Sequence, residues 1–329
     1  MKEAEFIAKI KKSLKGKKHS VVLPESSDKR ILEASQMLIK SGITPILIGD
    51  AKEILQQAKK HRIKIKEAII INNLISSKKA KYAKQLVEIR KKRNEILTLE
   101  QALDLLKTNM YFALMMLYNN ESDAVVAGAK YTTPEVLKPA FKIIGTDSHA
   151  SGAFFMLFKN KDYLFADCAV TPEPNAKELA ETAVTSAETY FKLTGKQPYV
   201  AMLSFSTNEL QNKTADKIRD AVKIAKIINP KLIIDGEMQL DAAIVPEVGK
   251  SKFPQSKVAG KANVLVFPDL NSGNIGYKLV ERFAGATAIG PLIQGIRKPV
   301  SDLSRGCSSK DVFETVLITL YLSQKKKLA

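Results

Sequence analysis

Ser20-Val-Val-Leu-Pro-Glu25 opens the part of the chain that decides the fold, and Thr44-Pro-Ile-Leu-Ile-Gly49 closes it. Each stretch is a short apolar run that ends at a turn residue, which predicts two buried strands. Between them, apolar residues recur at helical spacing over residues 28–41, and Gly42 ends the pattern. A strand, a helix and a strand in this order predict a βαβ unit, and therefore a parallel sheet covered by helices.

The same alternation continues along the chain and predicts an α/β protein with mainly parallel sheets covered by helices. The length of 329 residues agrees with about two domains. The polar stretch 145–152, bracketed by glycines, is the best candidate for the joint between them. Because the final helical segment 312–323 is strongly apolar, we expect it to return to the first domain. The first domain would then comprise residues 1–147 and 293–329, and the second 148–292.

Further elements follow from the same patterns. Strands are expected after Asp123 and at 68–71, 153–158, 164–169, 199–205, 232–235 and 264–267. Helices are expected at about 3–15, 51–60, 77–92, 99–118, 134–143, 175–194, 213–228 and 275–285. Open α/β sheets bind ligands at the carboxyl ends of their strands, so polar residues that follow a strand are candidate site residues.

One such group consists of Lys130, Thr132 and Thr133, in a glycine-containing turn that follows the strand after Asp123. An amine and two hydroxyls at this place are suited to hold an anion. The alternative is structural, with Thr133 as the N-cap of the next helix and Pro134 at its first position. The turn alone leaves both interpretations open.

A second group lies between Asp302 and Asp311, ahead of the final helix. Ser308 and Asp311 have the spacing of a capping box, which places free N–H groups and the positive end of the helix dipole just after Gly306. Arg305 directly precedes this helix end, so the stretch is suited to bind phosphate or another oxyanion. The alternative is that Ser308 and Asp311 only cap the helix, while Arg305 pairs with a surface carboxylate.

The two cysteines have different expected surroundings. Cys168 lies in an apolar strand pattern, which predicts a small core residue. Cys307 lies near a helix N-terminus beside Arg305, an environment that lowers the pKa of a thiol. A lowered pKa would make Cys307 reactive without making it catalytic.

Basic residues are concentrated near the start of the chain. Of the formal net charge of +18, residues 1–93 carry +15, with 24 Lys and Arg against 9 Asp and Glu. Clustered positive charge can bind the phosphates of nucleic acid. However, most of these lysines fall on amphipathic helical segments with few aromatic residues to stack bases. We interpret the excess as a solvated face, with nucleic-acid binding as the alternative from a different functional class.

Several other classes lose support because their signatures are missing. The longest apolar runs, such as 111–118, are far shorter than the roughly 20 residues of a membrane span. Lysines interrupt any apolar run after Met1, so no signal peptide is expected. The sequence has no GxxxxGK[ST], GxGxxG, HExxH or GxSxG motif, and its histidines have no metal-ligand spacing. With too few cysteines for a disulfide framework, a cytoplasmic protein is expected.

Five blocks of sequence together indicate a resemblance to a known family. They are Asp167-Cys-Ala-Val-Thr-Pro-Glu-Pro-Asn175, Ala201-Met-Leu-Ser-Phe-Ser-Thr207, Asp235-Gly-Glu-Met-Gln-Leu-Asp-Ala-Ala243, Lys257-Val-Ala-Gly-Lys-Ala-Asn-Val-Leu-Val-Phe-Pro-Asp-Leu270 and Asp302-Leu-Ser-Arg-Gly-Cys307. In these blocks, and also at Leu23-Pro-Glu25, the chain closely resembles the phosphate acetyltransferase (phosphotransacetylase) family. The match covers nearly the whole length.

The resemblance implies an acyltransferase that interconverts acetyl phosphate and coenzyme A with acetyl-CoA and inorganic phosphate. The thiol would attack directly in a ternary complex, with coenzyme A as a substrate, no permanently bound cofactor and no metal in the chemical step. The resemblance also implies a cytoplasmic homodimer whose first α/β domain is completed by the C-terminus, with an active-site cleft between the two domains. Neither a membrane nor a nucleic acid is an expected partner.

Family roles carry over to Ser304, Arg305 and Asp311 as catalytic groups. Acetyl phosphate is already activated, so the protein must mainly align the thiol, hold the phosphate and stabilise the oxyanion. Arg305 would supply positive charge, Ser304 would donate to the carbonyl oxygen and Asp311 would accept the thiol proton. Because proton transfer from a thiol to a carboxylate is about 6 kcal/mol uphill at reference pKa values, some further stabilisation is required.

Three more residues are implied as substrate-binding groups. Arg282 matches a family arginine, and Arg90 is a plausible equivalent of another. The residues that follow Arg90 depart from the short glycine-containing link that is usual in the family. Lys138 stands before Pro139, where the family commonly has arginine, so the charge is kept and the bidentate fork is lost. Two related kinds of protein remain as alternatives. One is a phosphate butyryltransferase, and the other is an isolated domain of the malic-enzyme type.

Overall fold

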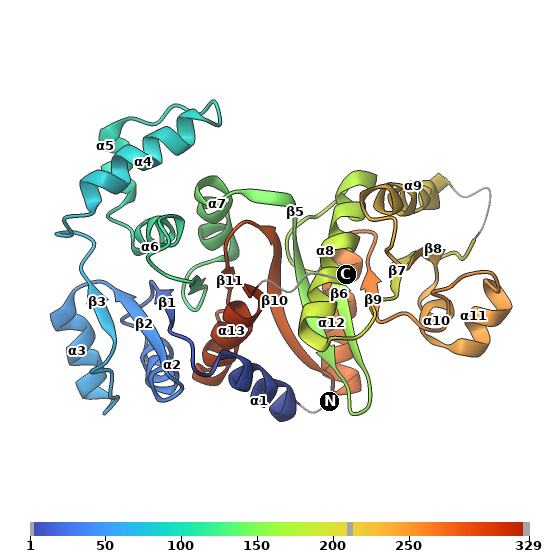
Figure 1. The fold of residues 1–329 in the computed structure, drawn as a ribbon, viewed down its shortest axis with the longest axis horizontal. Coiled ribbons are helices and arrows are strands. Elements are labelled where there is room, and N and C mark those ends of the chain that lie inside the picture. Colours follow the sequence, from blue (N-terminus) through green and yellow to red (C-terminus); the bar gives the residue numbers. More distant parts are fainter. Residues whose placement is uncertain (1–2, 209–212, 325–329) are drawn as a thin grey trace. The chain divides into compact units, whose positions relative to one another are not determined.

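The computed structural model describes residues 3–208 and 213–324 (Figure 1). It divides into two compact units. One consists of residues 7–146 and 296–324, and the other of residues 3–6 and 147–295. We refer to them as the β1 unit and the β6 unit, after a central strand of each. The two ends of the expected first domain, residues 1–2 and 325–329, lie outside the described residues.

The β1 unit is built on a five-stranded sheet in the order β11-β4-β1-β2-β3. All neighbouring strands are parallel, and β1 pairs with β2 so that His19 faces Ile43. The strands are β1 (His19–Leu23), β2 (Ile43–Ile48), β3 (Ile69–Ile71), β4 (Ala124–Ala127) and β11 (Val300–Asp302). The expected βαβ unit is therefore present. Strand β11 had not been predicted, and it brings the C-terminal segment into this sheet.

Helices of the β1 unit follow the expected pattern with one exception. They are α1 (Glu3–Leu14), whose first four residues are assigned to the β6 unit, α2 (Lys29–Lys40), α3 (Ala51–Lys60), α4 (Lys79–Lys91), α5 (Leu99–Leu105), α6 (Asn109–Tyr118), α7 (Thr133–Ile143) and α13 (Ser309–Leu322). The single helix expected at 99–118 is wrong, because Thr108 caps a new helix by accepting a hydrogen bond from the N–H of Tyr111. Helix α13 packs against α2 and β4, in agreement with its apolar sequence.

The β6 unit contains a six-stranded sheet in the order β10-β5-β6-β9-β7-β8. Strands β5 and β6 are antiparallel, whereas β6 with β9, β9 with β7 and β7 with β8 are parallel. The strands are β5 (Thr146–Leu157), β6 (Asp162–Ala166), β7 (Val200–Leu203), β8 (Ile234–Met238), β9 (Val264–Val266) and β10 (Thr287–Ile296). The polar stretch 145–152 was expected to be the joint between the two domains, and most of it is the first half of β5.

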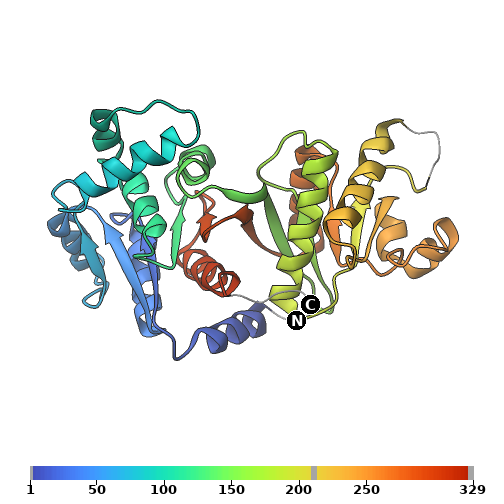
Figure 2. The same ribbon diagram turned by 45° about the horizontal axis from the view of Figure 1, so that its top comes forward.

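Five helices belong to the β6 unit in the part of the chain that the structure describes. They are α8 (Ala176–Thr194), α9 (Lys213–Ile228), α10 (Leu240–Ile244), α11 (Pro246–Lys252) and α12 (Leu270–Ala284). Helix α8 contacts β6, β7 and β9, and α9 lies beside it (Figure 2). Its buried Tyr190 ring meets the edge of Phe155 from β5 in the core. Within the described ranges, no helix is long and apolar enough to cross a membrane.

Candidate functional site

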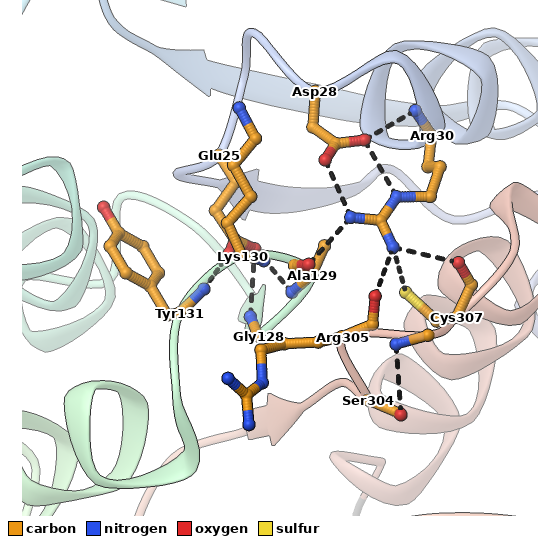
Figure 3. A network of polar contacts seen from close by, with 11 residues as sticks. Glu25, Asp28, Arg30, Gly128, Ala129, Lys130, Tyr131, Ser304, Arg305 and Cys307 are labelled. Atoms are coloured by element: carbon orange, nitrogen blue, oxygen red, sulfur yellow. Dashed lines mark hydrogen bonds and ion pairs between the residues drawn. The ribbon is translucent and has the colours of Figure 1, made fainter.

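The loops that leave β1, β4 and β11 lie side by side, because these three strands are neighbours in a parallel sheet. Glu25 follows β1, residues 128–132 follow β4, and residues 303–308 follow β11 and lead into α13. Figure 3 shows the polar contacts that join the three loops. Six of the nine residues predicted for the site belong to these loops or to the helix ends that they enter.

Glu25 is the anchor of the loop after β4. Its carboxylate is buried, with 5% of the residue exposed. Oε2 accepts hydrogen bonds from the N–H groups of Gly128 at 2.9 Å and Ala129 at 3.0 Å, and Oε1 accepts from those of Lys130 and Tyr131 (Figure 3). The carboxylate therefore fixes four successive peptide groups. Glu25 was quoted in a family motif but not predicted as a site residue, since its local sequence shows only a turn after a strand.

The threonines of this loop are engaged with the protein itself. Thr132 donates its backbone N–H and its hydroxyl to Glu135, and these hydrogen bonds lower the pKa of that carboxyl. The Thr133 hydroxyl donates to Oδ2 of Asp302 at 2.6 Å. Thr132 rather than Thr133 is the N-cap of α7, so the predicted capping residue was wrong by one position.

Asp302 ties the loop after β4 to the end of β11. It is 2% exposed, and burial raises the pKa of its carboxyl from 3.8 to about 6. A Cβ atom on Gly128 would lie 2.4 Å from Oδ1 of Asp302, and Gly128 has a φ of +112°. Both facts require glycine here. The two loops can therefore approach each other only because position 128 has no side chain.

Arg30, at the start of α2, joins all three loops. Its guanidinium forms an ion pair with Asp28 and donates to the carbonyl oxygens of Ala129, Arg305 and Cys307 (Figure 3). The hydrogen bonds that Arg30 donates to the Asp28 carboxylate raise the pKa of Arg30. Burial pushes the pKa of Asp28 upward, but its hydrogen bonds with Arg30 outweigh this effect and lower it. Arg30 was not predicted from the sequence.

The predicted capping box at the start of α13 is present. Ser308 accepts from the N–H of Asp311 at 3.2 Å, and Oδ2 of Asp311 accepts from the N–H of Ser308 at 2.8 Å. Ser304 Oγ accepts from the N–H of Gly306 at 3.3 Å. Arg305 is exposed, and its positive charge contributes to the lowered pKa of the Glu135 carboxyl, although no hydrogen bond or ion pair joins its guanidinium to another of the described residues. One short segment, the loop that enters α13 and the first turn of this helix, thus carries a hydroxyl, a cation and a carboxylate.

The environment of the Cys307 thiol differs from the one that the sequence predicted. Its thiol is 8% exposed and lies 3.8 Å from Nη1 of Arg30. Burial raises the pKa of Cys307, although the charge of Arg30 opposes this rise. The expected lowering of the pKa was therefore wrong, because the thiol faces the interior and not the helix end. Cys168 is buried in the core of the β6 unit, as predicted.

The remaining predicted residues are not part of these loops. Arg90 on α4 forms an ion pair with Glu95, a residue of the segment that departs from the family pattern. Lys138 is exposed on α7. Arg282 belongs to the β6 unit, on α12, with 80% of its side chain exposed. No group of histidine, cysteine, aspartate or glutamate suited to a metal ion occurs over residues 3–208 and 213–324.

Comparisons with known proteins point in one direction. Residues 5–320 match the family model described as phosphate acetyl/butaryl transferase. The chain is 46% identical to a phosphate acetyltransferase of Thermoanaerobacterium thermosaccharolyticum, over 97% of this chain and 99% of the relative. Another relative, from Clostridium acetobutylicum, is 45% identical over 98% and 99%. The solved structure of a phosphotransacetylase from Streptococcus pyogenes is similar with a TM-score of 0.94 and 39% identity, over 98% and 99% of the two chains. The chain therefore belongs to the phosphate acetyl/butaryl transferase family and is an acyltransferase.

Proposed function

We propose that this acyltransferase transfers an acetyl group reversibly between acetyl phosphate and coenzyme A, by direct attack of the thiol in a ternary complex. One observation carries the mechanism. The Ser304 hydroxyl, the exposed Arg305 guanidinium and the Asp311 carboxylate belong to one short segment at the N-terminus of α13, whose loop is held by Arg30. The names of the relatives support the substrates, because both are phosphate acetyltransferases.

Each group has a role that fits its contacts. Arg305 holds the phosphate of acetyl phosphate, with help from the dipole of α13. Ser304 Oγ already accepts a hydrogen bond from Gly306, so its own hydrogen is free to donate to the carbonyl oxygen as negative charge develops there. Asp311 accepts the thiol proton through the oxygen that Ser308 leaves free. The positive charge of Arg305 stabilises the emerging thiolate.

Cationic groups elsewhere are proposed to bind coenzyme A and its phosphates. Lys130 lies on the Glu25-anchored loop, and Arg90, Lys138 and Arg282 are the further candidates. Thr132 and Thr133 contribute by holding the turn, since their hydroxyls donate to Glu135 and Asp302. Coenzyme A enters as a substrate, and neither a permanently bound cofactor nor a metal is proposed.

We also propose that the protein forms a homodimer and that it acts in the cytoplasm. Ile275, Leu279 and Phe283 recur every four residues on α12, and 57%, 49% and 86% of these residues are exposed. This spacing places them on one face of the helix, where a second copy would cover them. Both cysteines are free thiols, as in proteins of reducing compartments. Light scattering should give a dimer mass for the unmodified chain and a smaller mass for Phe283→Glu.

The decisive experiment measures thioester formation from coenzyme A with acetyl phosphate and, separately, with butyryl phosphate. We expect a higher kcat/KM with acetyl phosphate. A preference for butyryl phosphate would assign the second activity in the family's name, and no thioester from either donor would overturn the proposal. A titration with nucleic acid at physiological salt, run beside it, tests whether the basic residues 1–93 bind phosphate backbones.

A further inference from the structure

All five N–H groups of the Arg30 guanidinium are used by the protein. Nε donates to Asp28 Oδ1 at 3.0 Å, and Nη2 donates to Asp28 Oδ2 at 2.8 Å and to the carbonyl oxygen of Ala129 at 2.7 Å. Nη1 donates to the carbonyl oxygens of Arg305 at 2.7 Å and Cys307 at 3.1 Å. A guanidinium has five such donors, so Arg30 has none left for an anionic substrate.

The two carbonyl groups held by Nη1 determine the direction of two amides. The 305–306 and 307–308 peptide bonds are trans, and in a planar trans peptide the C=O and N–H bonds point in opposite directions. With the carbonyl oxygens of Arg305 and Cys307 turned toward Arg30, the N–H groups of Gly306 and Ser308 are turned away from it. These two amides are the donors to Ser304 Oγ and Asp311 Oδ2.

We infer that Arg30 is a positioning residue for the proposed reaction. It sets the orientation of Ser304 through the 305–306 peptide group and that of Asp311 through the 307–308 peptide group. The inference rests on the proposed roles of Ser304 and Asp311. One planar fork reaches both carbonyl oxygens while Asp28 fixes its other edge. A lysine could keep the charge but could not hold this arrangement, because an ammonium has three donors and no plane.

The test compares Arg30→Lys with Lys298→Met. Lys298 also holds two backbone carbonyls of the β1 unit, those of Leu117 and Tyr118, each at 2.8 Å, but none in the 303–308 loop. For Arg30→Lys we expect kcat per folded molecule to fall about 10- to 100-fold, with KM for both substrates within about threefold, since a small misplacement affects mainly the chemical step. Lys298→Met should lower the melting temperature and leave kcat unchanged.

A double-mutant cycle shows whether Arg30 acts through the serine. If it does, Arg30→Lys should reduce kcat by a smaller factor in a Ser304→Ala background than in the wild type. Equal factors in both backgrounds would overturn the inference. So would an unchanged kcat in Arg30→Lys, or an increase in KM alone, which would identify a substrate-binding residue.

Hydrogen exchange separates this inference from the proposed function. Peptides that cover residues 303–308 should exchange faster in Arg30→Lys than in the wild type, and at the wild-type rate in Lys298→Met. Equal exchange in all three proteins would overturn the positioning role. If the wild type formed no thioester, the proposed function would fail, while faster exchange in Arg30→Lys would still show that Arg30 orders the loop.

Discussion

Glu25 and Asp167 build loops in the same way in the two units. Each is a buried carboxylate that accepts four backbone N–H groups. Glu25 receives those of residues 128–131. Asp167, which follows β6, receives those of Gly152 and of residues 169–171. A carboxylate of this kind replaces the water that the peptide groups of a tight loop would otherwise need.

The surroundings of the two carboxylates differ. Arg30 donates to Ala129, on the loop that Glu25 holds, and also to the loop that carries Ser304 and Arg305. Among the described contacts of Asp167, none is an ion pair, and the next residue is the core cysteine Cys168. The anchor is therefore a structural device that recurs. Chemistry depends on which side chains the anchored loop meets, and the Glu25 loop meets the guanidinium of Arg30.

The largest effect is expected at Asp311, which tests whether the end of α13 is more than a helix cap. Asp311→Asn keeps an oxygen for the N–H of Ser308 and should cost only about 0.5–1 kcal/mol of stability. It removes the proposed general base, so kcat should fall about 10²- to 10⁴-fold. Steady-state kinetics and thermal melting measure the two quantities.

Arg305→Lys serves as the companion variant. It keeps the charge and loses the fork, so its deficit should appear in turnover and in the KM for acetyl phosphate. If both variants lost melting temperature while kcat per folded molecule stayed at the wild-type value, Asp311 and Arg305 would be structural, and the two carboxylate-anchored loops would no longer differ in function.

Glu25→Gln and Asp167→Asn compare the two anchors directly. An amide offers one acceptor oxygen and turns its NH₂ group toward the remaining backbone donors, so buried N–H groups lose their partners. Each variant should lose roughly 2–4 kcal/mol of unfolding free energy, measured by denaturant titration. Only Glu25→Gln should also lower kcat per folded molecule, by about tenfold, since its loop adjoins the proposed catalytic groups. Equal effects on kcat would place the Asp167 loop in the reaction as well.

Titration of Asp302, which contacts the loop that Glu25 holds, should make the free energy of unfolding depend on pH. Its carboxyl has a pKa of about 6 in the folded protein against an ordinary value of 3.8. Between these values the folded state binds more protons, so the free energy of unfolding falls as the pH rises. Asp302→Asn removes this titration. Its unfolding free energy relative to wild type should therefore increase by roughly 1–3 kcal/mol between pH 4 and pH 7. Parallel stability curves would contradict the burial of a titrating Asp302.

The local pattern of the sequence was sufficient to predict most helices and strands of the fold. Short apolar runs and the helical spacing between them predicted the βαβ unit, and the spacing of Ser308 and Asp311 predicted the capping box. The start of β5 was missed because its polar residues at 146–150 resemble a loop, and the strand is defined by its partners in the sheet. Strands gain their stability from such pairing rather than from their own sequence.

The site was predictable only in part for a similar reason. Ser304, Arg305 and Asp311 belong to one short motif, so the resemblance could point to them. Glu25 and Arg30 act across 103 and 275 positions of sequence, respectively, through backbone atoms of other loops. Backbone N–H and C=O groups are the same in every residue, so no local pattern shows that two side chains far away in the sequence hold them.

The smallest effect is expected at Cys307. A direct attack by the thiol of coenzyme A needs no acyl-enzyme, and burial raises the pKa of the Cys307 thiol. Cys307→Ala, like Cys168→Ala, should therefore keep kcat within about tenfold of the wild type, because it removes no group from the proposed chemistry. Native Cys307 should react slowly with iodoacetamide at neutral pH, and faster once the chain is unfolded. Trapping an acetylated cysteine that discharges at the rate of turnover would instead make Cys307 the nucleophile, and Arg30, 3.8 Å from its sulfur, would then act on a reacting atom.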